Sequence, residues 1–107
     1  MPTRLILIRH GETQWNLEKR YMGLTDIGLN DTGIKQAKRL KVRLIKENVS
    51  RVYSSDRKRA FKFAKIIFPD LPIEKKAALR EMNFGVFDGL TYKENMEKYP
   101  KLYSNWL

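Results

Sequence analysis

The order of apolar and polar positions along the chain predicts alternating strands and helices. A continuous aliphatic run within residues 3 to 8 ends at charged residues and a glycine, which is typical of a buried parallel strand. Shorter runs predict strands at 49 to 54 and near 73 to 75. Residues 17 to 29 have no sustained period and contain two glycines, so we expect a loop there.

Two longer segments have the periodicity of amphipathic helices. Apolar residues recur at helical spacing from about Asn30 to Glu47, and either Asn30 or Asp31 can cap this helix. A second helix is predicted from about Arg57 to Phe68, where Pro69 stops it. The Ser-Ser-Asp cluster that precedes the second helix can cap it.

A third, shorter helix follows a glycine-bearing loop near the C-terminus. Thr91 and Glu94 form a Thr-x-x-Glu capping box for it, and Pro100 marks its end. The resulting order of strand, helix, strand, helix and strand predicts an α/β fold with a parallel sheet wrapped by helices. We expect residues 1 to 107 to form one folded unit, because no linker, repeat or low-complexity segment interrupts the pattern.

Charge adds a constraint that the apolar pattern does not contain. The 22 basic and 12 acidic residues leave a net charge of +10. The excess lies in residues 35 to 80, which hold fifteen basic and four acidic residues. Such a block can bind nucleic acid, an anionic surface or a small anionic substrate, or it can consist of helix faces that only contact solvent. Nucleic acid is the least favoured, because the basic residues of the first helix cover most of its solvent side without an aromatic stacking platform.

The composition also excludes several kinds of site. The absence of cysteine excludes disulfides, thiolate zinc sites and cysteine nucleophiles. One histidine and scattered carboxylates are too few to argue for a metal site, and nothing predicts a cofactor. No apolar run approaches the ~20 residues that cross a bilayer, and the first residues do not resemble a signal peptide. We therefore expect a cytoplasmic protein without membrane contact.

The candidate chemistry lies where the first two predicted strands end. Arg9, His10 and Gly11 follow the first strand, while Arg57 and Arg59 lie just beyond the second. Ligands bind at the carboxyl ends of parallel strands. A neutral imidazole can attack phosphorus and form a phospho-histidine, while arginines bind the phosphate oxygens. The alternative is that His10, the only histidine, is a hydrogen-bonded residue of the interior.

Four separate segments match one protein family in order and spacing. They are LIRHGETQWN, YMGLTDIGLNDTGIKQA, SSDRKRAFKFA and LREMNFGVFDG. Together they resemble the histidine phosphatase superfamily, also called the phosphoglycerate mutase-like family, from residue 3 to the last residue. The resemblance implies a three-layer α/β sandwich with a mainly parallel sheet, and an enzyme that hydrolyses small phosphate monoesters.

The resemblance also implies a role for each matching residue. His10 would be the phosphorylated nucleophile, and Glu81 would protonate the leaving oxygen and then help to activate water. The implied phosphate ligands are Arg9, Gly11, Asn16, Gly23 and Arg59. Because an acid in the role of Glu81 needs a raised pKa, we expect it to be buried among apolar neighbours, namely Met82, Phe84 and Phe87. The alternative is a surface carboxylate paired with Arg80.

Two departures from the family pattern narrow the expected reaction. Met82 stands where the mutases of the family have an arginine for a second anionic group, and Phe84 stands where they have a tyrosine. Both weaken the mutase alternative. The segment EMNFGVFDG is more similar to the phosphatase branch, particularly the alpha-ribazole phosphatases.

A further departure concerns the length of the chain. The family fold is nearly twice as long, and its later half contributes a second histidine that this sequence lacks. We therefore expect a truncated, N-terminal portion of the family domain that binds phosphate or sulfate with little or no catalysis. An unpaired sheet edge and uncovered apolar surface would make it self-associate. The remaining alternative is a pseudo-enzyme or oligomerisation module that keeps the sheet without the chemistry.

Overall fold

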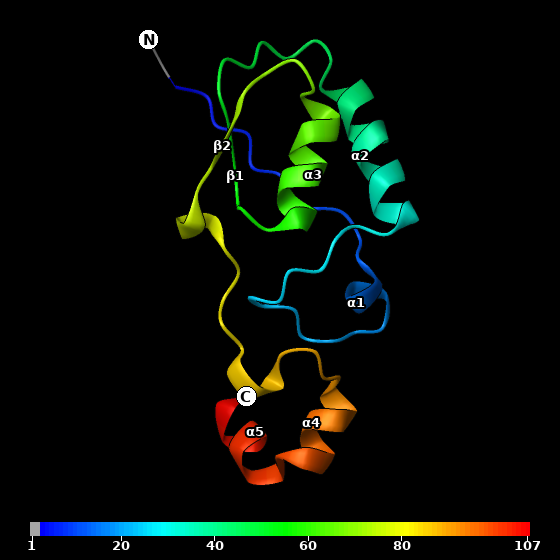
Figure 1. Ribbon diagram of the computed structural model, residues 1–107, viewed down its shortest axis with the longest axis vertical. Helices are drawn as coiled ribbons and strands as arrows, with labels where there is room; N and C mark the ends of the chain where they lie inside the picture. The colour runs from blue at the N-terminus through cyan, green and yellow to red at the C-terminus, as the bar shows by residue number, and fades with distance from the viewer. Residues whose placement is uncertain (1–2) are drawn as a thin grey trace.

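The computed structural model describes residues 3 to 107, in which two short strands pair in parallel (Figure 1). They are β1 (Val52–Ser54) and β2 (Ile73–Lys75), with Val52 opposite Ile73. Helix α3 (Lys58–Ile67) connects them, as a parallel pair requires a long crossover. The predicted α/β class is confirmed, and both strands lie within the segments predicted to form them.

The apolar core lies between α3 and α2 (Asp31–Arg43). Its centre consists of Ala37, Phe63 and Ile67, which are at most 5% exposed. Helical spacing places the two α3 residues on one face, so the periodicity in the sequence is the cause of the packing. Removing these side chains from water is the main force that joins the two helices.

The ends of these helices only partly follow the pattern-based expectation. Asn30 caps α2, because its Oδ1 accepts a hydrogen bond from the backbone N–H of Gly33 (2.8 Å). The helix ends at Arg43 and does not continue to Glu47. At α3, the first backbone N–H, of Lys58, donates to Oδ1 of Asp26 (2.7 Å). Asp26 of the loop at 17 to 29 therefore caps α3, while Ser55 of the predicted Ser-Ser-Asp cluster accepts a hydrogen bond from the N–H of Arg57, the residue before the helix (3.2 Å).

The buried strand predicted at residues 3 to 8 does not form. The backbone of this segment makes no strand pairing with other described residues, and Leu5 and Leu7 are 76% and 86% exposed. A parallel strand needs paired backbone groups and two covered faces. Residues 9 to 107 form no strand pairing with this segment and cover one of its faces only in part, since Ile6 and Ile8 are 36% and 38% exposed. The aliphatic run is therefore an exposed apolar segment.

Two short helices linked by aromatic contacts form the opposite end of the molecule (Figure 1). The predicted capping box begins α4 (Tyr92–Lys98), where Oγ1 of Thr91 accepts a hydrogen bond from the N–H of Glu94 (3.2 Å). Pro100 follows α4 as predicted, but it also opens α5 (Pro100–Trp106), which the sequence analysis did not predict. Tyr103 of α5 is fully buried, with its ring centroid 5.1 Å from that of Phe87.

Three further short helices were not predicted from the apolar pattern. They are α1 (Gln14–Leu17) and two single 3₁₀ turns at Ala77–Leu79 and Gly85–Phe87. Each is too short to show a helical period in the sequence. Among the described residues, no helix is long and apolar enough to cross a membrane.

Residues 20 and 21 connect the helical end to the rest of the chain. The N–H of Tyr21 donates to the carbonyl of Leu90 (3.0 Å), and the N–H of Gly89 donates to the carbonyl of Tyr21 (2.7 Å). Nη1 of Arg20 donates to the Glu94 carboxylate (2.6 Å) and to the carbonyl of Gly89 (2.8 Å). The molecule is elongated, with a radius of gyration of 16.3 Å, against about 13 Å for a compact domain of this size.

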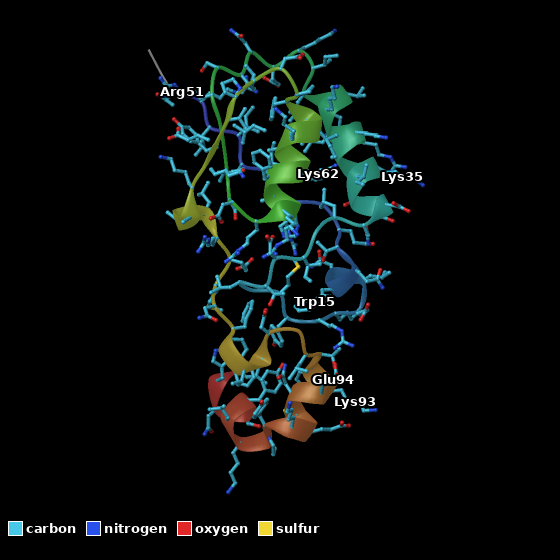
Figure 2. All side chains as sticks on the ribbon, in the orientation of Figure 1. Trp15, Lys35, Arg51, Lys62, Lys93 and Glu94 are labelled. Atoms are coloured by element: carbon cyan, nitrogen blue, oxygen red, sulfur yellow. The ribbon has the colours of Figure 1, made fainter. Side chains whose placement is uncertain are left out.

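Gly89 provides a test of this junction. Its φ is +81°, and a Cβ there would lie 2.9 Å from the ring of Trp15, a residue of α1 that Figure 2 labels on the side toward the C-terminal helices. We expect Gly89→Ala to lower the free energy of unfolding by about 1–3 kcal/mol, because an L residue is strained at this φ.

Urea denaturation measures the effect, and Gly28→Ala is the matched control. A Cβ at Gly28 has no neighbour within 4 Å, and its backbone is outside the left-handed region. This variant should change the free energy of unfolding by less than about 0.5 kcal/mol. Equal losses in the two variants would contradict the packing described at Gly89.

Candidate active site

His10 is partly buried, and its ring orientation is set by its own backbone neighbour. Nδ1 lies 2.7 Å from the carbonyl oxygen of Gly11. A carbonyl can only accept a hydrogen bond, so Nδ1 carries the proton in the neutral ring. The lone pair is then on Nε2, the nitrogen that can attack an electrophile or accept a proton.

The surroundings of His10 favour its neutral form. Burial is the largest cause that lowers its pKa below the usual 6.5, and the positive charges of Arg59 and Arg9 lower it further. The hydrogen bond to Gly11 and the Glu81 carboxylate act in the opposite direction and raise the pKa of His10. The net effect is an imidazole that is unprotonated at neutral pH.

Gly11 brings His10 close to both core helices. A Cβ at Gly11 would lie 2.7 Å from the Phe63 ring of α3 and 2.8 Å from the carbonyl oxygen of Gly33 in α2. A Cβ at Gly33 would in turn overlap the carbonyl oxygen of Glu12. Only glycine permits these approaches, so the pair fixes the backbone on which His10 stands.

Arg59 is 2% exposed and is held by the loop before α2. Its Nη1 donates to the carbonyl of Thr25 (2.8 Å) and its Nη2 donates to the carbonyl of Gly23 (2.7 Å). Burial lowers the pKa of Arg59, although the carboxylates of Asp26, Glu81 and Asp88 oppose this effect. A guanidinium has five N–H donors, so the two carbonyls leave three for other acceptors.

Asp88 shapes the same loop, and the sequence analysis did not single it out. Its Oδ1 accepts a hydrogen bond from the N–H of Gly23 (2.6 Å), and its Oδ2 accepts one from the hydroxyl of Thr25. Both backbone groups of Gly23 therefore have protein partners, in Asp88 and Arg59. The Asp-Gly pair in FGVFDG was the available signal, because such pairs mark turns that place a side chain on a nearby backbone.

Asn16 lines a different hollow from His10. Its Oδ1 accepts hydrogen bonds from the N–H (3.0 Å) and the hydroxyl (3.1 Å) of Thr13, which completes the capping box of α1. Asn16 lines a hollow of about 270 Å³ whose other walls come from the junction with α4: Lys19, Arg20, Tyr21 and Tyr92. The structure thus places this predicted phosphate ligand in a different hollow from His10.

Glu81 is near the site but exposed to solvent. It lies close enough to His10 and Arg59 for its charge to affect the pKa of both. Its Oε1 accepts a hydrogen bond from the N–H of Met82 (3.0 Å). The expected burial among Met82, Phe84 and Phe87 is wrong, because Met82 is 55% exposed and the two phenylalanines pack in the aromatic cluster with Trp106.

The exposure of Glu81 agrees with the alternative of a surface carboxylate, but Arg80 is not its partner. Arg80 forms a two-pronged ion pair with Asp56, from Nε to Oδ1 (2.8 Å) and from Nη2 to Oδ2 (2.5 Å). This contact ties the backbone next to Glu81 to the turn between β1 and α3. Because this turn also leads to Arg59, the pair helps to keep the Glu81 carboxylate near Arg59.

A hollow of about 340 Å³ opens between residues 9 to 11 and α2. Arg9, His10 and Gly11 line one side, and α2 contributes Gln36, Arg39, Leu40 and Arg43, with Phe63 of α3 beside them. The sequence analysis placed Arg9 here but did not predict Arg39 or Arg43. Among residues 3 to 107, no group of three or more histidine or carboxylate side chains is placed to hold a metal ion.

Solved structures with the same fold extend well beyond this chain. A putative alpha-ribazole-5'-P phosphatase from Escherichia coli superposes with a TM-score of 0.89 at 34% identity, over 92% of this chain and 51% of that protein. A phosphoserine phosphatase from Entamoeba histolytica, solved with 3-phosphoglyceric acid, has a TM-score of 0.74 at 36% identity, over 83% of this chain and 47% of that protein. The predicted phosphoglycerate mutase-like fold is confirmed.

Sequence comparison gives the same result. Phosphoglycerate mutase-like protein 4 from Arabidopsis thaliana is 44% identical over 103 residues, which are 92% of this chain and 45% of that protein. The chain spans about half the length of the relatives it matches. A family profile matches residues 5–107, which include His10, Arg59 and Glu81. This chain therefore belongs to the histidine phosphatase superfamily (branch 1).

Proposed function

We propose that this chain carries the phosphate-attacking part of a phosphatase, with His10 as the nucleophile toward a small phosphate monoester. The observation that supports this most directly is the hydrogen bond from Nδ1 of His10 to the carbonyl of Gly11 (2.7 Å). It leaves the Nε2 lone pair available for attack on phosphorus. The lowered pKa of His10 keeps that lone pair unprotonated at neutral pH.

The proposed reaction has two steps. Nε2 of His10 attacks phosphorus, so that the N–P bond forms while the bond to the leaving oxygen breaks, and Glu81 gives that oxygen a proton. Water then attacks the phosphorus and passes a proton to the Glu81 carboxylate, while the N–P bond breaks and phosphate leaves. Arg9 and Arg59 offset the charge of the phosphoryl oxygens in both steps.

For the reaction, we propose that of the phosphatase branch, in which this chain most resembles the alpha-ribazole phosphatases, and not that of the mutases. The Escherichia coli structure supports this choice through its fold, and the Entamoeba histolytica complex is consistent with a phosphate ester. Met82 brings no charge to the position that the mutases fill with arginine. A mutase must hold a second phosphate group, so this position disfavours mutase activity.

We further propose that residues 1 to 107 alone bind phosphate but turn substrate over slowly. The family resemblance implies a second histidine opposite the first, and His10 is the only histidine in this sequence. Loss of one donor from a preorganised site typically costs ~10²–10³ in rate. The exposed Glu81 also lacks the apolar cover that a proton donor needs. We expect efficient turnover only in a longer protein that includes the second half.

Phosphate binding tests the proposed function. We expect inorganic phosphate to shift the single imidazole NMR signal of His10, with an affinity that falls roughly tenfold in Arg9→Gln as a charge-assisted hydrogen bond is lost. Arg51→Gln removes the same charge from an exposed arginine, labelled in Figure 2, and should have little effect. A His10 signal that phosphate does not shift would contradict the function.

Hydrolysis of p-nitrophenyl phosphate tests separately the proposal that residues 1 to 107 alone turn substrate over slowly. We expect the chain and its His10→Ala variant to hydrolyse this ester at similar rates, close to that of buffer. Robust turnover that His10→Ala abolishes would contradict the low turnover, although it would support His10 as the nucleophile.

The pKa of His10 also predicts a pH dependence of stability. Because its folded pKa is below 6.5, the unfolded chain binds more protons than the folded chain between these two values. The contribution of His10 to the free energy of unfolding is therefore fully present above pH 6.5, and it is lost as the pH falls through the pKa of His10 in the folded protein. We expect His10→Gln to lose less stability than the wild type between about pH 7 and about pH 5 in urea titrations. Identical slopes would show that the pKa of His10 is not lowered on folding.

We also propose that this chain self-associates. Leu5 and Leu7 are 76% and 86% exposed in a segment that lacks strand pairing with other described residues. Exposed apolar segments with free backbone groups promote association. In sedimentation velocity at high micromolar concentration, we expect a species larger than a monomer, and more monomer when both leucines are replaced by aspartate. A wild type that sediments as a monomer would contradict the proposal.

A further inference from the structure

The hollow beside His10 has more positive charge than the proposed phosphate chemistry uses, because only Arg9 of its arginines has a role there. Three arginines line it, Arg9 from the segment after residue 8 and Arg39 and Arg43 from α2. The lining contains no acidic residue, and none of the three makes an ion pair with another described residue. Like charges that are gathered without a counter-charge attract anions.

The two α2 arginines are on the same face of the helix. Gln36, Arg39, Leu40 and Arg43 follow the spacing i, i+3, i+4 and i+7, so they form one stripe toward the hollow. Oε1 of Gln36 accepts a hydrogen bond from the N–H of Glu12 (2.8 Å), which attaches this stripe to the segment after His10. This contact holds α2, which carries Arg39 and Arg43, beside the segment after His10.

Two other residues that line the hollow are apolar and can contact an apolar part of a ligand. Phe63 is 5% exposed and Leu40 is partly buried, and both line the hollow. A volume of about 340 Å³ is at the lower end of ligand sites, which hold roughly 300–1,000 Å³. A ligand that fills it would have a small apolar body, with negative charge at the end near Arg39 and Arg43.

We propose that Arg39 and Arg43 bind a second anionic group on the substrate, on the part of the ester that leaves when phosphate is transferred to His10. This inference rests on the proposed function, since it places the phosphate at His10. The preferred substrates are then small phosphate esters whose apolar body carries a carboxylate or a similar anion. Arginine is well suited to this contact, because its planar fork donates two parallel hydrogen bonds to one carboxylate.

A matched pair of ligands tests the proposal. Phenyl phosphate and 4-carboxyphenyl phosphate differ only in one carboxylate, and calorimetry gives the dissociation constant of each. We expect the wild type to bind the carboxylated ester roughly tenfold more tightly, which is the size of one charge-assisted hydrogen-bonded contact. In the double variant Arg39→Gln and Arg43→Gln, the ratio of the two affinities should fall to about one.

The control variant removes the same charge from the opposite side of α2. Lys38 and Lys41 are exposed and do not line the hollow. Lys38→Gln with Lys41→Gln should keep the tenfold preference, because the long-range field decreases equally in both double variants. Equal loss of preference in the two variants, or no preference in the wild type, would overturn the proposal. Circular dichroism spectra verify that both variants retain α2.

Benzoate distinguishes failure of this proposal from failure of the proposed function. It carries the carboxylate and the ring without the phosphate. If neither ester binds through His10 but benzoate binds and requires Arg39 and Arg43, the anion site stands and the phosphatase function fails. If phenyl phosphate binds and neither carboxylate ligand gains affinity from the two arginines, the function stands and the anion site is overturned.

Discussion

The buried guanidinium of Arg59 is the interaction on which the arrangement of the site depends. Its side chain comes from α3, and it is held by the carbonyls of Gly23 and Thr25 at 2.7 and 2.8 Å. A buried charge is stable only when hydrogen-bonded, so the loop cannot leave Arg59 without a large cost. Asp88 closes the same loop from the other side. One charge therefore joins the core helices to the segment that leads to the C-terminal part.

His10 depends on a second constraint, which is steric. Gly11 and Gly33 allow the backbone of residues 10 to 12 to approach α2 and α3 more closely than any Cβ would permit. This approach buries the imidazole in part and directs Nδ1 to the carbonyl of Gly11. The chemical state of His10 thus follows from backbone packing, while the nearby arginines adjust its pKa.

Local sequence rules predicted the features that depend on near neighbours in the chain. Caps at Asn30 and Thr91 were predictable because one side chain and one nearby N–H decide them. The strand at residues 3 to 8 was not, because an aliphatic run becomes a strand only if other chain segments cover it and pair with it. The cap of α3 by Asp26 was also beyond local rules, since its partner is 32 positions away along the chain.

The sequence by itself determined the family and the α/β class and supplied the candidate site residues, because these depend on residue type, order and local period. The tertiary structure decided how those residues are combined. It placed Asn16 in a different hollow from His10, left Glu81 in solvent and brought Arg39 and Arg43 to the hollow that His10 lines. The physical reason is that such placements depend on contacts between distant segments, whose packing and charge compensation no single stretch of sequence contains.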